Sequence, residues 1–141
     1  MIRFFDTSVL IPVFNLDHVH HEASFQAFVS ATRKTSCCAA HSLAEMYAVL
    51  TRLPGKNRLG GEQANLLLEE VSSRLALISL TGEEYLLAMK QAAARGISGG
   101  TVYDYLLLFC ADKVNAETIY TWNLKHFQKF GPEFSGRLRA P

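Results

Sequence analysis

Short apolar runs that alternate with longer helical stretches constrain the fold of this chain most. Four runs are expected to be buried strands, namely Ile2–Phe5, Ser36–Ala40, Leu75–Leu80 and Glu117–Thr121. Helical spacing of apolar residues fills the stretches between them. Strands that are apolar throughout are typical of a parallel sheet with helices on both faces. The sequence therefore predicts an α/β fold, a three-layer α/β/α sandwich with a mainly parallel sheet of four to five strands.

The end of the chain carries a weaker signal. From Gly131 onward, Pro132, Gly136 and Pro141 leave little to fix the backbone, and a short edge strand is expected near Leu138. No linker or internal repeat divides the sequence. Residues 1–141 are therefore interpreted as one domain, which is long enough to bury a single core.

Composition excludes several classes of protein. The formal net charge of +1 neither demands nor excludes a nucleic-acid partner, so any basic surface must be local. Cys37, Cys38 and Cys110 lack zinc-ligand spacing and form a poor disulfide framework, which favours reduced core residues in a cytoplasmic protein. No apolar run is long enough to span a membrane, and Asp6 interrupts the only stretch that resembles the start of a signal peptide.

Acidic residues are expected at one edge of the sheet. Asp6 ends the first strand, Glu45 lies in the first turn of the helix after the second strand, and Asp104 lies in the first turn of the helix before the last. Helices that precede a parallel strand begin at the edge where strands end, so the three carboxylates should converge there. Asn123 follows the last strand and joins them.

Helix capping is the competing interpretation of these acids. Ser42 to Glu45 matches the capping-box pattern, and Thr101 to Asp104 resembles it. Glu84 is an internal control, because it is a cap-like acid to which no catalytic role is assigned. Three carboxylates gathered in one crevice would repel one another, and a hard divalent cation such as Mg²⁺ removes that conflict. The convergence therefore favours a metal-dependent phosphodiester hydrolase.

Four sequence blocks carry a family resemblance that covers essentially the whole chain. They are Phe5–Leu10 (FDTSVL), Ser42–Tyr47 (SLAEMY), Gly99–Asp104 (GGTVYD) and Tyr120–Phe127 (YTWNLKHF). In order and separation they resemble the successive motifs of PIN-domain nucleases, and the length is similar to that of the VapC toxins of bacterial toxin–antitoxin pairs. The resemblance implies a PIN-like nuclease domain that hydrolyses RNA.

Residue by residue, the resemblance implies that Asp6, Glu45 and Asp104 bind Mg²⁺ or Mn²⁺. The fourth family position is often an aspartate, and here it is Asn123, which supplies no negative charge. One well-held ion is therefore expected, with any second ion recruited by substrate phosphate. Thr7 and Thr121 are candidates for hydroxyls that support the ligands, and both fit ordinary capping or strand-end roles equally well. A small VapB-like antitoxin and a homodimer are the partners that the resemblance implies.

RNA binding requires local cations and aromatic rings. Arg52, Lys56 and Arg58 in or beside one loop, and Lys125 and His126 after Asn123, are candidates for phosphate contacts, although both groups also fit ordinary solvated surfaces. Trp122 and Tyr103 flank the expected site and are candidates for base stacking, with core packing the simpler interpretation for Trp122.

Three histidines and two alternative functions need separate interpretation. His18, His20 and His21 do not have the spacing of metal ligands on one helix face, so they are interpreted as surface residues at a helix start. A haloacid-dehalogenase-type phosphatase also has an aspartate after its first strand, but it needs a second aspartate where Ser8 stands. The alternative from another class is an inactive or weakly active PIN-fold domain that binds RNA or a protein, which Asn123 favours.

Overall fold

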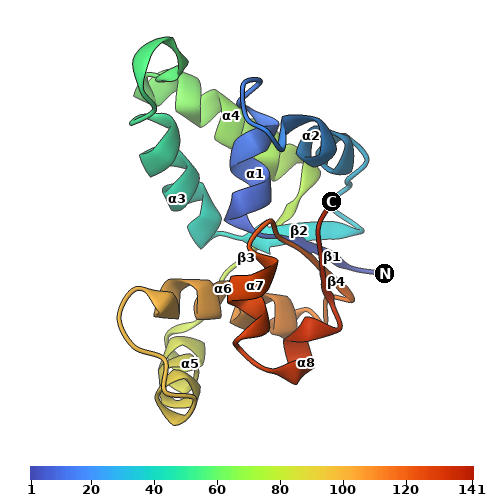
Figure 1. The fold of residues 1–141 in the computed structure, drawn as a ribbon, viewed down its shortest axis with the longest axis vertical. Helices are drawn as coiled ribbons and strands as arrows, with labels where there is room; N and C mark the ends of the chain where they lie inside the picture. Colours follow the sequence, from blue (N-terminus) through green and yellow to red (C-terminus); the bar gives the residue numbers. More distant parts are fainter.

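A five-stranded parallel sheet forms the centre of the molecule (Figure 1). The computed structural model describes residues 1–141, and the strand order is β3-β2-β1-β4-β5 with every neighbouring pair parallel. The strands are β1 (Arg3–Phe5), β2 (Ser36–Ala39), β3 (Ala76–Ile78), β4 (Thr118–Tyr120) and β5 (Leu138–Arg139). The predicted α/β/α fold is confirmed, and the sheet is parallel throughout.

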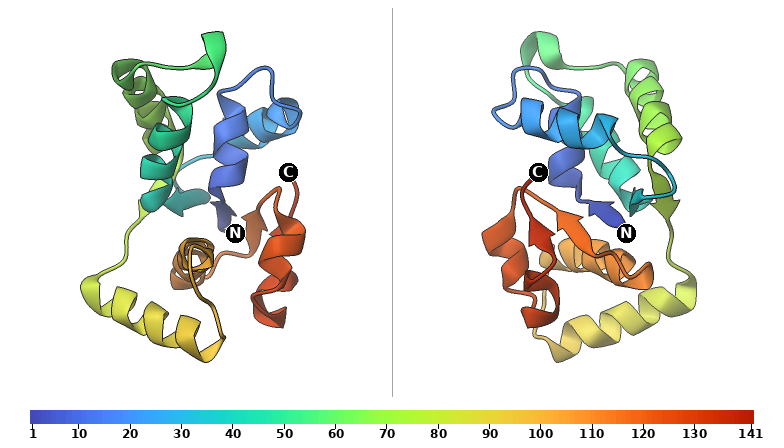
Figure 2. Two further views of the ribbon diagram at one scale, coloured as in Figure 1. Left: turned by 60° about the vertical axis from the view of Figure 1, so that its left-hand side comes forward. Right: turned by 90° about the vertical axis from the view of Figure 1, so that its right-hand side faces the viewer.

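Helices cover both faces of this sheet. They are α1 (Thr7–Val13), α2 (His21–Val29), α3 (His41–Leu50), α4 (Gly61–Arg74), α5 (Gly82–Ala94), α6 (Thr101–Lys113), α7 (Leu124–Gln128) and α8 (Pro132–Ser135), with a 3-10 turn η1 (Gly55–Asn57). Helices α1 to α4 lie on one side of the sheet and α5 to α8 on the other, as Figures 1 and 2 show. None of these helices combines the length and hydrophobicity that crossing a bilayer requires.

The two faces of the central strand β1 supply separate cores. Phe4 is fully buried among residues of α5 to α8, and Phe5 is fully buried among residues of α1 to α4. Alternation of side chains along a strand forces this division, and each phenylalanine contributes about 2 kcal/mol of burial free energy. Two rings thus fix β1 from both sides, and Asp6 follows at its end.

Cysteines pack into both cores as free thiols. Cys37 and Cys110 lie in the core on the α5 to α8 side, and Cys38 lies in the other. Burial raises the pKa of the Cys37 and Cys38 thiols to about 12 and that of Cys110 to about 11. The thiols are therefore protonated and chemically inert in the native protein.

The C-terminal segment corrects one expectation. Its edge strand β5 is where the sequence predicts it, but the prediction that little fixes the segment is wrong. Phe134 and Leu138 are buried, and the Arg137 guanidinium donates to Asp112 Oδ1 at 2.6 Å and to the Ala116 carbonyl oxygen at 3.2 Å. These contacts are distant in sequence, so local composition does not reveal them.

The carboxyl edge of the sheet is where the candidate site forms. The parallel register pairs Phe5 with Tyr120, so Asp6 and Thr121 emerge next to each other. Helix α1 begins directly at Asp6, and α3 begins two residues after β2 ends. Helix α6 precedes β4, so its N-terminus returns to the same edge.

Candidate functional site

Asp6 occupies the centre of this edge and is almost completely buried. It caps helix α1, and its Oδ2 accepts hydrogen bonds from the Ser8 hydroxyl at 2.7 Å and the Thr121 hydroxyl at 2.9 Å. Its other oxygen, Oδ1, accepts no hydrogen bond from the protein, yet it is not sealed from solvent. One carboxylate oxygen is thus held by the fold and the other is left open to the crevice.

Burial sets the electrostatics of Asp6. It raises the pKa of the Asp6 carboxyl, and the negative charge of Asp104 raises it further, whereas the Ser8 and Thr121 hydrogen bonds lower it. The raised pKa means that the charged form is costly in the absence of a cation. Two hydroxyl donors offset only part of this cost.

Glu45 is tied to the same centre through hydroxyl groups. Thr7 Oγ1 donates to Glu45 Oε1 at 3.2 Å and lies 2.7 Å from Ser42 Oγ. His41 Nε2 lies 3.7 Å from Glu45 Oε1, and Oε2 has no hydrogen-bond partner in the protein. Burial raises the pKa of Glu45, the charges of Asp6 and Asp104 raise it further, and His41 and Thr7 lower it.

Asp104 approaches from the opposite side of the sheet. It lies in the first turn of α6, as predicted, and its Oδ2 is 2.7 Å from His126 Nε2 of α7. Its Oδ1 has no hydrogen-bond partner in the protein. The charge of Asp104 reaches both Asp6 and Glu45, because it raises the pKa of each.

Asp6 caps helix α1, but side-chain capping does not explain Glu45 or Asp104. Helix α3 begins at His41 after Ala40, so Ser42 is inside the helix and Glu45 is beyond the first turn, contrary to the sequence prediction. Gly100 precedes α6, so Thr101 caps nothing. The control behaves as a cap should: the Thr81 hydroxyl accepts from the Glu84 backbone N–H at 3.1 Å, and Glu84 accepts from Thr81 N at 2.9 Å. The Ser42 hydroxyl contacts Thr7 instead of its own helix because that tertiary partner is available.

The acidic centre, defined here as Asp6, Glu45 and Asp104, has the chemistry of a hard-cation site. Each of its acids keeps one oxygen without a protein partner, and carboxylate oxygens are the ligands that Mg²⁺ prefers. As the side chains stand, no three acidic, imidazole or thiol groups are close enough together to hold a metal ion. Metal binding by these three residues therefore stays a prediction. The chemistry of their oxygens fits it.

Asn123 and Thr121 lie where the last strand ends. Thr121 is fully buried, and its Oγ1 also accepts the Asn123 backbone N–H at 3.0 Å. The Asn123 side chain is exposed and forms no cap hydrogen bond at the start of α7. Its amide is thus free to face a ligand.

Basic residues are distributed unevenly around the acidic centre. Arg52, Lys56 and Arg58 lie beyond the end of α3, on a loop that the helix carries away from the sheet (Figure 1). Arg52 is seven residues after Glu45, or about 10 Å further along the helix direction. Lys125 is exposed on α7, two residues after Asn123. The phosphate contacts of both groups stay predictions, and Lys125 is the residue that lies next to the expected site in sequence.

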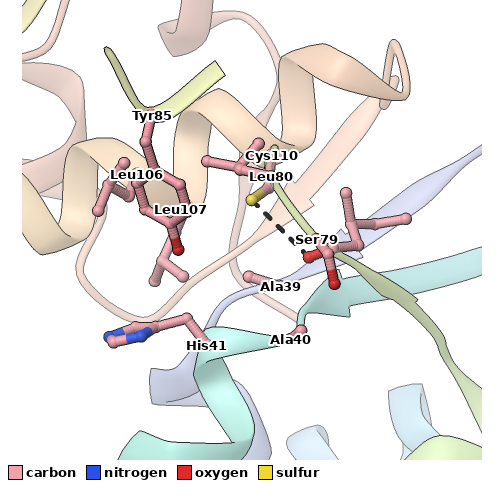
Figure 3. A pocket seen from close by; sticks show the side chains of 10 residues that line it. Ala39, Ala40, His41, Ser79, Leu80, Tyr85, Leu106, Leu107 and Cys110 are labelled. Carbon is pink, nitrogen blue, oxygen red and sulfur yellow. Dashed lines mark hydrogen bonds between the residues drawn. The ribbon is translucent and has the colours of Figure 1, made fainter. Parts of the chain in front are cut away.

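Three hollows flank the acidic centre, and each includes a residue in contact with one of its acids. An apolar one of about 240 Å³ contains His41, the neighbour of Glu45, where Tyr85, Leu107 and Cys110 converge from α5 and α6 (Figure 3). A second, of about 290 Å³, contains His126, the neighbour of Asp104, together with Lys129. The third, of about 310 Å³, contains Ser8, the neighbour of Asp6.

Sequence reasoning missed the side chains that hold the acids in place. Ser8 and His41 received no role in the site, Ser42 was considered only as a helix cap, and His126 was considered only as a phosphate contact. The spacing of Ser8, two residues after Asp6, is the one local signal, because a hydroxyl there reaches back to a capping carboxylate. The others come together only through the tertiary fold.

Comparison with known proteins gives this geometry its family. The model of the PIN domain matches residues 3–131, and the chain therefore belongs to the PIN-domain family. Its relatives include ribonuclease VapC27 of Mycobacterium tuberculosis, which is 40% identical over 113 residues, covering 79% of this chain and 78% of that protein. Ribonuclease VapC40 of the same species is 32% identical over 114 residues, or 81% of each protein.

Solved structures agree on the fold. The crystal structure of VapC20 of M. tuberculosis, described as a sarcin–ricin-loop-cleaving toxin, has a TM-score of 0.70 at 16% identity and covers 89% of this chain and 92% of its own. VapBC2 of Rickettsia felis, bound to a DNA fragment from its promoter, has a TM-score of 0.67 at 20% identity. The match covers 100% of this chain and 99% of that chain. These likenesses confirm the PIN fold.

Proposed function

We propose that this protein is a Mg²⁺- or Mn²⁺-dependent endoribonuclease that hydrolyses RNA phosphodiester bonds. The observation that carries the proposal is the acidic centre, in which three acids of one sheet edge each keep an unpartnered oxygen. Relatives that are ribonucleases by name, at up to 40% identity, support the same activity.

Asp6, Glu45 and Asp104 are the residues that would hold the cation. A divalent ion held there would supply Lewis-acid chemistry, namely activation of a water and stabilisation of negative charge on the phosphodiester. The chain itself orients the ligands: Ser8 and Thr121 fix one oxygen of Asp6, Thr7 fixes one oxygen of Glu45, and His126 holds Asp104. Because burial and mutual repulsion raise the pKa of Asp6 and Glu45, a positive ion relieves a cost already present in the fold.

Asn123 sets the number of ions that the site holds without substrate. A neutral amide offers an oxygen ligand or orients a water, but it adds no negative charge to the three carboxylates. We therefore expect one ion in the free enzyme, with a second recruited only by the phosphate of a bound RNA.

The relatives also support a proposal for assembly and cellular role. We propose that the protein is the toxin of a VapBC-type pair, that it is cytoplasmic, that a small VapB-like antitoxin covers the acidic centre, and that the protein forms a homodimer. Similarity to VapC ribonucleases and to the fold of VapBC complexes supports this assignment. A short open reading frame next to the gene, whose product co-purifies with this chain, would support the pairing, and light scattering would give the oligomeric state.

Cleavage of total cellular RNA tests the proposed activity. The wild type should cut RNA with Mg²⁺ or Mn²⁺ and lose cleavage in EDTA, and Asp6→Asn should lose more than about a hundredfold, beyond what loss of an outer-shell partner costs. Glu84→Gln is the matched control, because glutamine preserves a capping box. Equal cleavage by wild type and Asp6→Asn would refute the proposal.

A non-catalytic binding domain is the second candidate, and Asn123 is the observation that favours it. In that case the folded protein would bind RNA or the antitoxin but take up no divalent ion. Isothermal titration of the wild type with Mn²⁺ separates the two, since the nuclease requires a binding signal that Asp6→Asn weakens.

A further inference from the structure

The hollow beside Ser8 differs from the other two in the chemistry of its walls. Its polar and aromatic lining comes from Ser8, His18, His20, Trp122 and Asn123. No lysine, arginine or carboxylate lines it, whereas the hollow beside His126 contains Lys129 and the hollow beside His41 is mainly apolar. A volume of about 310 Å³ is at the lower end for small-ligand pockets.

A rigid aromatic platform forms one wall. The Trp122 backbone N–H donates to Ser8 Oγ at 3.0 Å, and the indole Nε1 donates to Ser24 Oγ, itself fully buried, at 2.9 Å. The His20 ring lies flat on the indole, with centroids 3.7 Å apart and planes inclined by 6°. The indole is therefore held at both ends, and it holds the imidazole in turn.

The remaining polar groups are neutral and arranged for hydrogen bonding. His18 Nδ1 accepts the His20 backbone N–H at 3.0 Å, so the His18 ring carries its proton on Nε2. Burial lowers the pKa of His18, and nearby His20 lowers it further, which keeps this ring uncharged. The Asn123 amide offers both a donor and an acceptor and has no side-chain partner in the protein.

This combination suits a nucleobase and not a phosphate. A flat ring platform accepts the face of any base, and neutral donors and acceptors read its edge. A phosphate subsite is usually built with lysine or arginine, and neither lines this hollow.

Ser8 fixes the position of this hollow relative to the acidic centre. The same Ser8 oxygen that accepts the Trp122 N–H donates to Asp6 Oδ2 at 2.7 Å. We propose that the hollow of Ser8, His18, His20, Trp122 and Asn123 is a nucleobase subsite, in which the base next to the scissile phosphate stacks on His20 while His18 and Asn123 read its edge. The inference rests on the proposed RNA substrate and adds the feature that selects where the strand is cut.

Tryptophan fluorescence tests the subsite without requiring cleavage. Trp122 is the only tryptophan in the chain, so its emission reports on this hollow alone. Asp6→Asn protein, titrated with a short single-stranded RNA, should show an emission change that an abasic strand of equal length does not produce. Equal responses to both strands would overturn the proposal.

Substitutions at His20 provide the specificity control. His20→Leu in the Asp6→Asn background keeps the indole covered but removes the ring, so affinity for the base-containing strand should fall by roughly five- to a hundredfold. His20→Phe restores a ring and should restore affinity, and Val19→Ala, at an exposed neighbouring residue outside the hollow, should bind unchanged. Unchanged affinity in His20→Leu would overturn the proposal.

Cleavage mapping separates failure of the subsite from failure of the proposed function. On a randomised RNA, the otherwise wild-type enzyme should prefer certain bases at one nucleotide beside the cut, and His20→Leu should lose that preference. Cleavage whose preferences are the same in both proteins would leave the nuclease standing and overturn the subsite. Base-dependent fluorescence without any cleavage would leave the subsite standing and refute the nuclease.

Discussion

Removal of one buried hydroxyl, in Thr121→Val, measures how the fold supports the acidic centre. Valine has nearly the shape of threonine, so the packing of this fully buried residue is conserved. The substitution removes the 2.9 Å hydrogen bond to Asp6 Oδ2, the acceptor for the Asn123 N–H at 3.0 Å and the 3.3 Å hydrogen bond with the Ser8 hydroxyl. Asn123 is exposed, so water replaces its partner, but nothing replaces the donor to Asp6.

The expected loss of stability follows from the charge of the acceptor. A hydrogen bond to a charged group contributes about 1.5–3 kcal/mol, and one between neutral groups about 1 kcal/mol. With Asp6 ionised, Thr121→Val should therefore lower the free energy of unfolding by about 2 kcal/mol. For a domain of this length that corresponds to a fall in Tm of roughly 6–8 °C.

The pH dependence has a definite sign. Burial holds the pKa of Asp6 above its unfolded value, so this residue makes both proteins less stable as pH rises through the folded pKa. The Thr121 hydrogen bond lowers that pKa, and without it the pKa is higher still. The variant must therefore lose more stability than the wild type as pH rises, and the gap between them is wider at about pH 8 than at about pH 4.

Urea unfolding in EDTA at both pH values checks this reasoning. Thr118→Val is the matched control, because Thr118 begins the strand β4 that leads to Thr121 and its hydroxyl makes no hydrogen bond. That control should show a small effect that does not change with pH. If the difference in free energy of unfolding between wild type and Thr121→Val stays constant with pH, or increases in acid, the hydroxyl does not support a buried carboxylate charge.

Two further predictions concern buried ionisable groups. In EDTA at neutral pH, Asp6→Asn should melt at a higher temperature than the wild type, because the amide removes a charge that burial and Asp104 oppose. Mg²⁺ should raise the Tm of the wild type alone. Thermal scans with and without Mg²⁺ measure both effects. Thiol labelling at about pH 8 should be slow in the native protein and complete in urea, because burial raises the pKa of every thiol, to about 12 for Cys37 and Cys38 and about 11 for Cys110. Rapid labelling of any cysteine in the folded state would contradict this.

The layers of the fold could be predicted from sequence because burial imposes a local pattern. Apolar runs such as Phe4–Phe5 have to be covered on both faces, and helices between them dictate parallel strands. The tail could not be predicted, because its order comes from Arg137, whose guanidinium reaches Asp112 and Ala116 in a different part of the chain. Helix α3 starts earlier than expected for a similar reason, since Ser42 contacts Thr7 and does not cap the helix.

In the candidate site, too, some contacts follow from the sequence pattern and others only from the tertiary fold. Contact between Asp6 and Thr121 follows from strand register, and the approach of Asp104 follows from the direction of α6. The pairing of His126 with Asp104, and the stack of His20 on Trp122, join segments that share no periodic pattern. Topology thus predicts which elements meet. Side-chain partners that join loops can be identified only in the three-dimensional structure.

The distribution of charge bears on how the proposed nuclease would hold RNA. The chain carries a net charge of only +1, and Arg52, Lys56 and Arg58 lie beyond the far end of α3. Lys125 and Lys129 lie on α7 and at its end, and Arg139 pairs with Tyr120 between β5 and β4, so the C-terminal segment brings cations to this edge. In the proposed nuclease, a cation on the three carboxylates and stacking against His20 and Trp122 would add to these phosphate contacts, and Ser8 links the two through one hydroxyl.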